Sequence, residues 1–395
     1  MIQYRAVARN WYLTKVILLG LSVVLLAGLA GSAATRQVAT KPARHATSTT
    51  ITISPAGTGA VGPKTPITVA AAGGTLTAVT AVNDHSGNAV HGTFAADHRS
   101  WRSDEPLGYG ADYTVHATGS GDAEETGAVH VVQPEGTAFP AMIPAPNAAP
   151  DYGVGQIFGV SFDHPVTDRA TAERSLKVTS VPEQPGSWYW MDNKTVHFRP
   201  KTYWQPGTTV TLTAGVYGVD LGGGRYGETD RTATYKIHDS WVAKADGGTH
   251  QVQVFHNGQL LRTMPTSLGS PDNPSHEGPH VVSERLPHVV MDSCTFGVCK
   301  GQPGYYKSDV DLAVRISNDG EFVHSAPWSV GQQGNSNVSH GCVNLAPANA
   351  QWFFDHFNLG DVVEITNSGG PQLPVWDVYG DWAVSWAQWQ KGSAL

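Results

Sequence analysis

Short runs of alternating apolar and polar residues dominate the chain after residue 50. Runs such as ITIS (51–54), DYTVHATG (112–119) and KTVHFRP (194–200) alternate with a period of two, and glycine or proline lies close to their ends. This alternation places apolar side chains on one face of a β-strand, and the bounding residues are typical of turns. The pattern predicts a mainly β protein.

A shift of 97 residues superposes part of this region on itself. It aligns Trp101 with Phe198, Gly110 with Gly207, Tyr113 with Val210, Thr114 with Thr211, Val115 with Leu212 and Ala117 with Ala214. We interpret this as a weak internal repeat that predicts two β-sandwich modules, 51–133 and 134–238, each of the size of an immunoglobulin-like domain. The alternative is a chance likeness between ordinary strands.

The third region, 239–367, combines strands with one clear helix signal. Pro347 stands at the first turn of this helix, Trp352, Phe353 and Phe357 form its apolar stripe, and Gly360 ends it. The strand DVVEIT follows. The region therefore predicts a β-rich domain with one or two helices.

Residues 368–395 form a Trp-rich C-terminal extension. Trp382, Trp386 and Trp389 follow i, i+4, i+7 spacing, which predicts a short helix that packs back onto the third region. A stripe that binds a membrane surface or the cell wall is the alternative.

The N-terminus carries an export signal. Nineteen uncharged residues, Val16–Ala34, follow the cations Arg5, Arg9 and Lys15. This length lies between a cleavable signal peptide and a membrane span, so 1–34 is predicted to be one or the other. Residues 35–50 are small and polar and predict a flexible tether. The rest of the chain is expected outside the cytoplasm.

Composition and charge narrow the function classes. The chain has 44 glycines and 25 prolines in 395 residues, which suits many strands and turns. The formal charge is −8, and without the three N-terminal cations 22 basic residues face 33 acidic ones. Nucleic acid is therefore not an expected partner.

The densest candidate chemistry lies around Cys342. A thiol is nucleophilic as thiolate, and an unperturbed pKa of about 8.5 leaves little thiolate at neutral pH, so a base is needed. His324 ends a predicted strand, and a hairpin between the two residues would bring it beside Cys342. Gly341 lets backbone N–H groups face an oxyanion. The alternative is a small buried cysteine near an unrelated histidine.

These residues resemble the signature of the L,D-transpeptidases, whose catalytic domain is of the YkuD type. The signature is a His, a spacer, then Ser/Thr-His-Gly-Cys, one residue and Asn, and here it is filled by His324 and by 339–344 (SHGCVN). The layout of the whole chain is similar to mycobacterial and related actinobacterial members. The resemblance implies two immunoglobulin-like sandwiches followed by a YkuD-type domain.

The resemblance also implies roles for individual residues. Cys342 matches the nucleophile, His324 the general base, and Ser325 the residue whose backbone carbonyl orients the imidazole. The oxyanion contacts would come from backbone at His340, Gly341 and Cys342, with Tyr306 of a lid. The expected donor-peptide pocket comprises Met291, Tyr306, Asp319, Gly320, Trp328, Ser339 and Asn344. One departure is the turn at 274–280 (PSHEGPH), where the family usually has Thr-Pro-x-Gly.

The activity implied is a peptidoglycan L,D-transpeptidase that forms 3→3 cross-links, with stem peptides as substrates and carbapenems as inhibitors. An L,D-carboxypeptidase using the same site, or a non-catalytic immunoglobulin-like wall-binding protein, are the alternatives. No cofactor and no metal ion are expected.

Cys294 and Cys299 fall in the region that corresponds to the lid. Outside the cytoplasm a small-loop disulfide is favoured over two free thiols. A zinc site is a weaker alternative, because these two cysteines lack a convincing set of four ligands.

Overall fold

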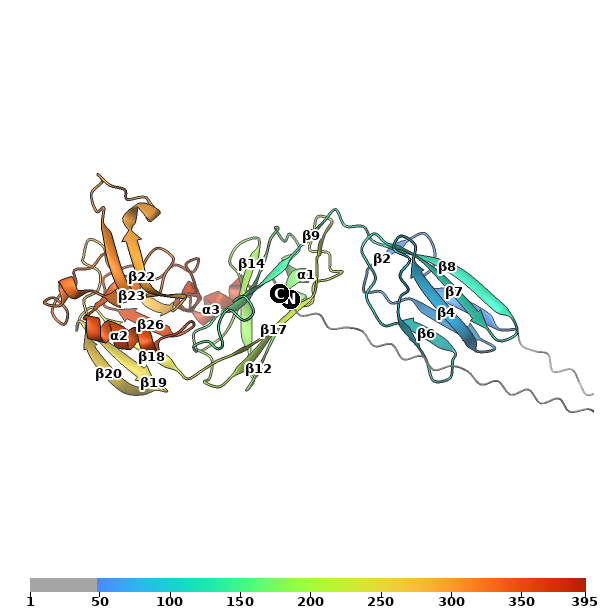
Figure 1. The fold of residues 1–395 in the computed structure, drawn as a ribbon, viewed down its shortest axis with the longest axis horizontal. Coiled ribbons are helices and arrows are strands. Elements are labelled where there is room, and N and C mark those ends of the chain that lie inside the picture. The colour runs from blue at the N-terminus through green and yellow to red at the C-terminus, as the bar shows by residue number, and fades with distance from the viewer. Residues whose placement is uncertain (1–47) are drawn as a thin grey trace, which may run out of the picture. The chain divides into compact units, whose positions relative to one another are not determined.

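A computed structural model describes residues 48–395 of the chain (Figure 1). The predicted signal or anchor segment and the tether up to residue 47 lie outside the described residues. No helix within 48–395 has the length and apolar character needed to cross a bilayer.

The first part of the described chain is a two-sheet β-sandwich. Its strands are β1 (Thr50–Ser54), β2 (Ala60–Val61), β3 (Thr68–Ala72), β4 (Leu76–Asn83), β5 (Gly92–Phe94), β6 (Ser100–Ser103), β7 (Asp112–Gly119) and β8 (Ala123–Val131). The sheets have the orders β1-β3-β6-β5 and β2-β8-β7-β4. Side chains on β7 alternate between exposed and buried, and Tyr113, Val115 and Ala117 enter the core, as the alternating pattern predicts.

A second sandwich repeats this arrangement. Its elements are β9 (Gly136–Ala138), β10 (Pro140–Ile143), β11 (Phe158–Phe162), α1 (Arg169–Arg174), β12 (Leu176–Val181), β13 (Gly186–Trp190), β14 (Thr195–Pro200), β15 (Thr209–Ala214), β16 (Arg225–Gly227) and β17 (Arg231–Lys236). The main sheets are β10-β11-β14-β13 and β12-β15-β17.

The 97-residue shift superposes equivalent strands of the two sandwiches. Trp101 on β6 and Phe198 on β14 are both buried, and each of these strands is the third of four in the order of its sheet. Gly110 and Gly207 both have positive φ, at 61° and 80°, in the turns before β7 and β15. A side chain is strained at such a φ, so the repeated glycine reflects a repeated turn.

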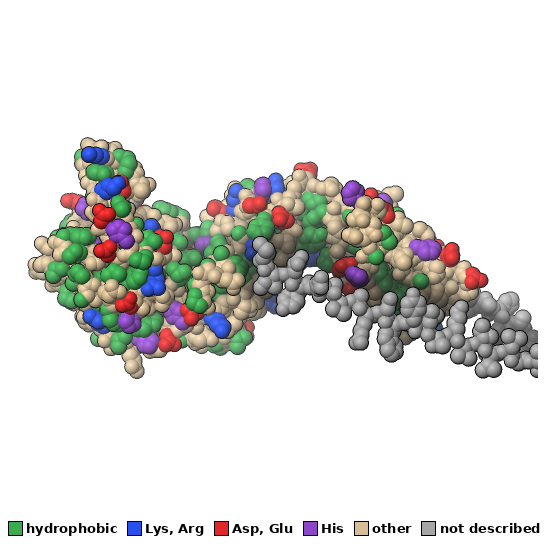
Figure 2. Space-filling view, viewed as in Figure 1, with side chains coloured by type: hydrophobic (Ala, Val, Ile, Leu, Met, Phe, Trp, Pro, Cys, Tyr) green, Lys and Arg blue, Asp and Glu red, His purple; other side chains and the backbone are tan. Residues whose placement is uncertain are grey.

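The third region contains two sheets and a helix. Its elements are β18 (Trp241–Asp246), β19 (Gln251–His256), β20 (Gln259–Pro265), β21 (Gly278–Val281), β22 (Glu284–Asp292), η1 (Ser293–Phe296), β23 (Lys307–Arg315), β24 (Phe322–Ser325), η2 (Pro327–Ser329), β25 (Val343–Leu345), α2 (Pro347–His356) and β26 (Val362–Thr366). The sheet orders are β20-β19-β18-β26-β21 and β22-β23-β24-β25. Helix α2 begins at Pro347 as predicted and buries Phe353, and Trp352 packs half-buried against the same core. The helix ends at His356, before the predicted stop at Gly360, and the buried Phe357 follows as its C-cap. Strands β22 and β23 extend beyond the rest of this region (Figure 1). Acidic and basic side chains are interspersed over the surface of the region (Figure 2).

The hairpin predicted between His324 and Cys342 is wrong. Strands β24 and β25 pair in parallel, with His324 opposite Asn344 and Val323 opposite Val343. Parallel neighbours need a crossover connection, which residues 326–342 provide with η2 and a series of turns. Because side chains alternate along each strand, His324, Asn344 and the residue two before it, Cys342, belong to one face of the sheet.

The Trp-bearing helix of the extension does not pack on the third region, contrary to the prediction. The extension contains η3 (Gly380–Ala383), α3 (Trp386–Trp389) and η4 (Gln390–Gly392). Trp389 is fully buried against the second sandwich, where its Nε1 donates to the Ser187 carbonyl at 2.9 Å and its ring stacks on Tyr189. The guanidinium of Arg199 on β14, itself 2% exposed, lies 4.6 Å from the Trp389 ring centroid. A buried cation needs such partners, and the aromatic rings supply them.

The residues before this helix do contact the third region. The Leu373 N–H donates to the Glu277 carbonyl at 2.9 Å, and Asn318 donates to the Asp377 carboxylate. The extension therefore contacts both the third region and the second sandwich.

Candidate active site

Cys342 lies at the end of a tight turn that leads into β25. Gly341 before it has φ of 115°, a conformation that favours glycine. Cys342 is 6% exposed and packs with Met291, Val310 and Phe322. It is the one free cysteine among the described residues.

His324 lies on β24 with its imidazole buried. Its Nδ1 is 2.9 Å from the Ser325 carbonyl oxygen, so Nδ1–H donates there and Nε2 is left as the nitrogen able to accept a proton. Burial lowers the pKa of His324 to about 4, although the Ser325 carbonyl and Asn344 favour the charged form. The imidazole is therefore neutral at neutral pH.

The Cys342 thiol is also neutral in this environment. Burial raises its pKa to about 12, and the nearby Glu321 carboxylate acts in the same direction. Its Sγ lies 3.6 Å from the Gly320 carbonyl oxygen, to which the S–H donates. The resting site thus holds a thiol and a neutral imidazole rather than a thiolate and an imidazolium.

One cavity of about 250 Å³ contains both residues. Of the pocket residues predicted from sequence, it is lined by Met291, Tyr306, Trp328, Ser339 and Asn344 together with His340, His324 and Cys342. Sequence reasoning missed three further lining residues, Ser308, Val310 and Val338. The Trp328 indole is 58% exposed at this cavity, and its ring centroid lies 5.9 Å from that of His324.

Asp319 and Gly320 do not line that cavity. They line a neighbouring one of about 260 Å³, together with His276, Glu321 and Gly341. Tyr306 and His340 border both cavities, and their ring centroids lie 4.9 Å apart. The turn that carries Cys342 therefore has a cavity on either side.

Hydrogen bonds fix the backbone of this turn. The Ser339 Oγ donates to the Cys342 carbonyl at 2.7 Å and accepts from the Gly341 N–H at 3.2 Å. The Gly341 carbonyl accepts from the Ser275 Oγ at 2.6 Å. Ser275 is a further residue that sequence reasoning missed, since its only signal was its place in the unusual turn at 274–280.

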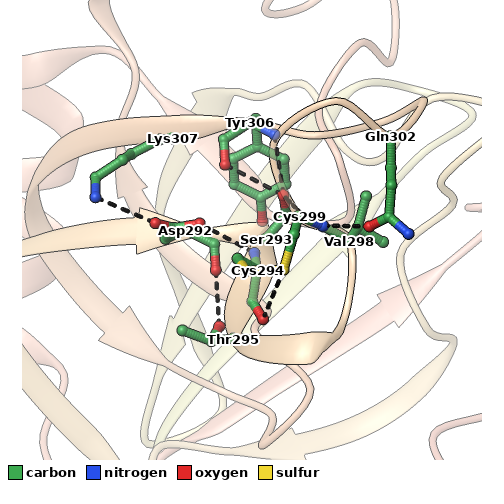
Figure 3. The surroundings of a disulfide bond; sticks show 9 residues. All are labelled: Asp292, Ser293, Cys294, Thr295, Val298, Cys299, Gln302, Tyr306 and Lys307. Atoms are coloured by element: carbon green, nitrogen blue, oxygen red, sulfur yellow. Dashed lines mark hydrogen bonds and ion pairs between the residues drawn. A yellow bond between two sulfur atoms is a disulfide. The ribbon is translucent and has the colours of Figure 1, made fainter.

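The predicted disulfide between Cys294 and Cys299 is present, in the segment that joins β22 to β23 (Figure 3). The Asp292 carboxylate caps η1 at the start of this loop by accepting from the Cys294 N–H. The Ser293 Oγ donates to the Val298 carbonyl at 2.8 Å and accepts from the Tyr306 N–H at 3.0 Å. The disulfide loop is thus hydrogen-bonded to the backbone of Tyr306, whose ring borders both cavities.

His276, Asp319 and Glu321 are the described residues that could hold a metal ion. One donor atom of each lies within 4.8 Å of the others. The carboxylates also suit a protonated imidazole: Glu321 Oε1 lies 3.3 Å from His276 Nδ1 and raises the pKa of His276. Glu321 is further held by the His276 N–H at 2.7 Å and by His280 Nε2 at 3.1 Å. That no metal ion is needed stays a prediction.

Comparison with known proteins identifies relatives along most of the chain. Residues 240–365 match the YkuD family, described as the L,D-transpeptidase catalytic domain, and residues 58–220 match a bacterial Ig domain. L,D-transpeptidase 2 of Mycobacterium tuberculosis is 43% identical over 333 residues, which cover 83% of this chain and 81% of the relative. L,D-transpeptidase 5 of the same species is 35% identical over 364 residues, covering 87% and 77%.

A solved structure is also similar. An LD transpeptidase in complex with imipenem aligns with a TM-score of 0.50 and 35% sequence identity, over 57% of this chain and 99% of that one.

Proposed function

This chain belongs to the L,D-transpeptidase family, and from that premise we propose that it forms 3→3 cross-links between peptidoglycan stem peptides through a thioester on Cys342. The observation that carries the proposal is that Cys342 and His324 line one cavity while the Ser325 carbonyl leaves Nε2 of His324 free to accept a proton. Asn344 and Trp328 complete that cavity as donor-binding residues.

Acylation begins with the neutral pair. As Cys342 Sγ attacks the carbonyl carbon that links the third residue of a donor tetrapeptide to its terminal D-Ala, the thiol proton passes to Nε2 of His324. The carbonyl electron pair moves to oxygen, where the backbone N–H groups of His340 and Cys342 stabilise it, because the Gly341 N–H is already bonded to the Ser339 Oγ. Collapse breaks the C–N bond, and His324 returns the proton to the departing D-Ala amine.

Transfer reverses these roles. The amine on the third residue of a neighbouring stem attacks the thioester carbon and loses a proton to His324. The C–S bond breaks, Cys342 recovers its proton, and the new amide is the cross-link. Water in place of the amine would make the enzyme an L,D-carboxypeptidase.

The other domains of the chain are consistent with an enzyme that acts in the peptidoglycan layer. We assign 51–133 and 134–238 as immunoglobulin-like spacers, 239–367 as the catalytic domain and 368–395 as its extension. We place the enzyme outside the cytoplasm, held or exported by residues 1–34, because its substrate lies there. The imipenem complex of a similar enzyme supports carbapenems as acylating inhibitors of Cys342.

Two measurements test the proposal. Purified protein incubated with disaccharide-tetrapeptide should yield D-Ala and dimers, detected by muropeptide analysis; free tripeptide without dimers would refute transpeptidation and indicate the carboxypeptidase. Intact-mass measurement after imipenem should show an adduct that Cys342→Ala abolishes. An adduct that survives this substitution would exclude Cys342 as the nucleophile.

A further inference from the structure

The peptide group between Gly341 and Cys342 has two possible orientations. Because glycine tolerates a wide range of φ and ψ, Gly341 permits this peptide to rotate, and the turn sequence alone does not choose its direction. The amide is planar and trans, so its C=O and N–H point in opposite directions. Whatever holds the Gly341 carbonyl therefore also aims the Cys342 N–H.

Ser275 holds that carbonyl. Its side chain is fully buried, and its Oγ donates to the Gly341 carbonyl at 2.6 Å while accepting from the Gly269 N–H at 3.0 Å. The Gly269 N–H fixes the hydroxyl directly, whereas a separate hydrogen bond runs from the Ser368 Oγ to the Ser275 backbone carbonyl at 2.7 Å. The hydroxyl is thus a rigid hydrogen-bond donor, contributed from 66 residues upstream of Gly341.

Two further polar groups of the turn, the Gly341 N–H and the Cys342 carbonyl, are already engaged. The Ser339 Oγ accepts a hydrogen bond from the Gly341 N–H and donates one to the Cys342 carbonyl. Within residues 48–395 the Cys342 N–H has no hydrogen-bond acceptor. It is therefore available for an oxyanion that forms on the acyl carbon bonded to Sγ.

We infer that Ser275 is a positioning residue for the oxyanion site, acting through the Gly341–Cys342 peptide. The inference rests on the proposed function. As Sγ bonds to the carbonyl carbon, the carbonyl electron pair moves to oxygen and accepts a hydrogen bond from the Cys342 N–H. The C–N bond then breaks, and the thiol proton reaches the departing nitrogen through His324. Without the Ser275 hydroxyl the peptide can rotate, and the oxyanion loses its aligned donor.

The experiment compares two reactions of the same sulfur in the full chain. Imipenem acylation passes through an oxyanion, whereas alkylation by iodoacetamide displaces iodide and forms none. Ser275→Ala should slow acylation about 100- to 1,000-fold, in line with loss of one oxyanion donor, and leave alkylation at pH 9 within twofold of wild type. Ser275→Thr keeps the hydroxyl and should restore acylation.

Ser368→Ala is the matched control, because it removes a buried hydroxyl from the backbone of Ser275 but leaves the Ser275 hydroxyl in place. It should acylate within twofold of wild type. An equal loss of both rates in Ser275→Ala, acylation at the wild-type rate, or failure of Ser275→Thr to restore it would overturn the inference. A wild-type protein without any imipenem adduct would instead refute carbapenem acylation under the proposed function, and the inference with it.

Discussion

The buried pair Cys342 and His324 makes a quantitative prediction about pH. With burial raising the pKa of the thiol to about 12 and lowering that of the imidazole to about 4, moving the proton from sulfur to nitrogen in the resting site is strongly disfavoured. At pH 7.5 a free thiol with a pKa of about 8.5 holds roughly 3,000-fold more thiolate than one with a pKa of about 12. Substrate binding must therefore accompany the proton transfer.

Acidification is the perturbation that tests this state. Between pH 7.5 and pH 5 the thiol with a neutral imidazole stays the main species, so imipenem acylation of Cys342 should change less than twofold. A histidine with an ordinary pKa of about 6.5 would lose roughly 30-fold over the same range. Below about pH 4 the rate should fall tenfold per unit as His324 becomes charged.

Stopped-time intact-mass measurement gives the acylation rate at each pH. Iodoacetamide provides the second profile: its rate should rise tenfold per pH unit up to pH 10 without a plateau, with Cys342→Ala as the blank. Alkylation that levels off below pH 8, or acylation that falls with a midpoint near pH 6.5, would refute the neutral pair. Either result would mean that a thiolate or an accessible imidazole exists before substrate binds.

Three further predictions concern stability and the disulfide loop. Trp389→Ala should lower the unfolding free energy of the second sandwich by about 3–5 kcal/mol in urea, because it empties a fully buried site. As a control, Trp376 is 67% exposed, so Trp376→Ala should change this free energy by less than about 0.5 kcal/mol. Similar effects of the two substitutions would contradict the burial of Trp389 against the second sandwich. Replacing both Cys294 and Cys299 by serine should remove a loop constraint worth about 2 kcal/mol of stability and increase trypsin cleavage in 294–307. It should also raise the KM for the donor peptide more than it lowers kcat. An unchanged KM would show that the disulfide loop does not position Tyr306. The folded pKa of His324 lies below the unfolded value of about 6.5, so on acidification the unfolded state binds a proton before the folded state does, and stability is lost from pH 6.5 down to about pH 4. Between pH 7 and pH 4.5, urea titrations should show that His324→Gln loses about 2–3 kcal/mol less unfolding free energy than wild type. Equal losses in the two proteins would contradict the lowered pKa.

Local patterns were sufficient for much of the fold. Alternation and turn glycines predicted the strands that carry Trp101 and Phe198, because burial of one strand face and a positive φ are imposed residue by residue. The signature around Cys342 was also readable, since His324 and Asn344 lie on neighbouring strands and are separated by one short crossover.

Non-local choices were not readable. An isolated run of residues contains no information on whether its neighbour is parallel or antiparallel, so the relation between β24 and β25 had to come from the structure. Ser275 lies 66 residues from Gly341, and a buried serine has no periodicity to mark it. The destination of Trp389 depends on Arg199, 190 residues earlier, and the same indole spacing would fit many surfaces.

The contact between Trp389 and Arg199 has a consequence for the order of assembly. A chain synthesised from its N-terminus completes the strand that carries Arg199 long before the final tryptophans are made. Until then the second sandwich carries a cation and an open aromatic surface, and the junction with the extension stays unfinished. The contact of the last residues with the second sandwich can therefore form only once synthesis is complete. A chain that ends before Trp389 would contain every proposed catalytic residue and still lack the contact that joins the extension to the second sandwich.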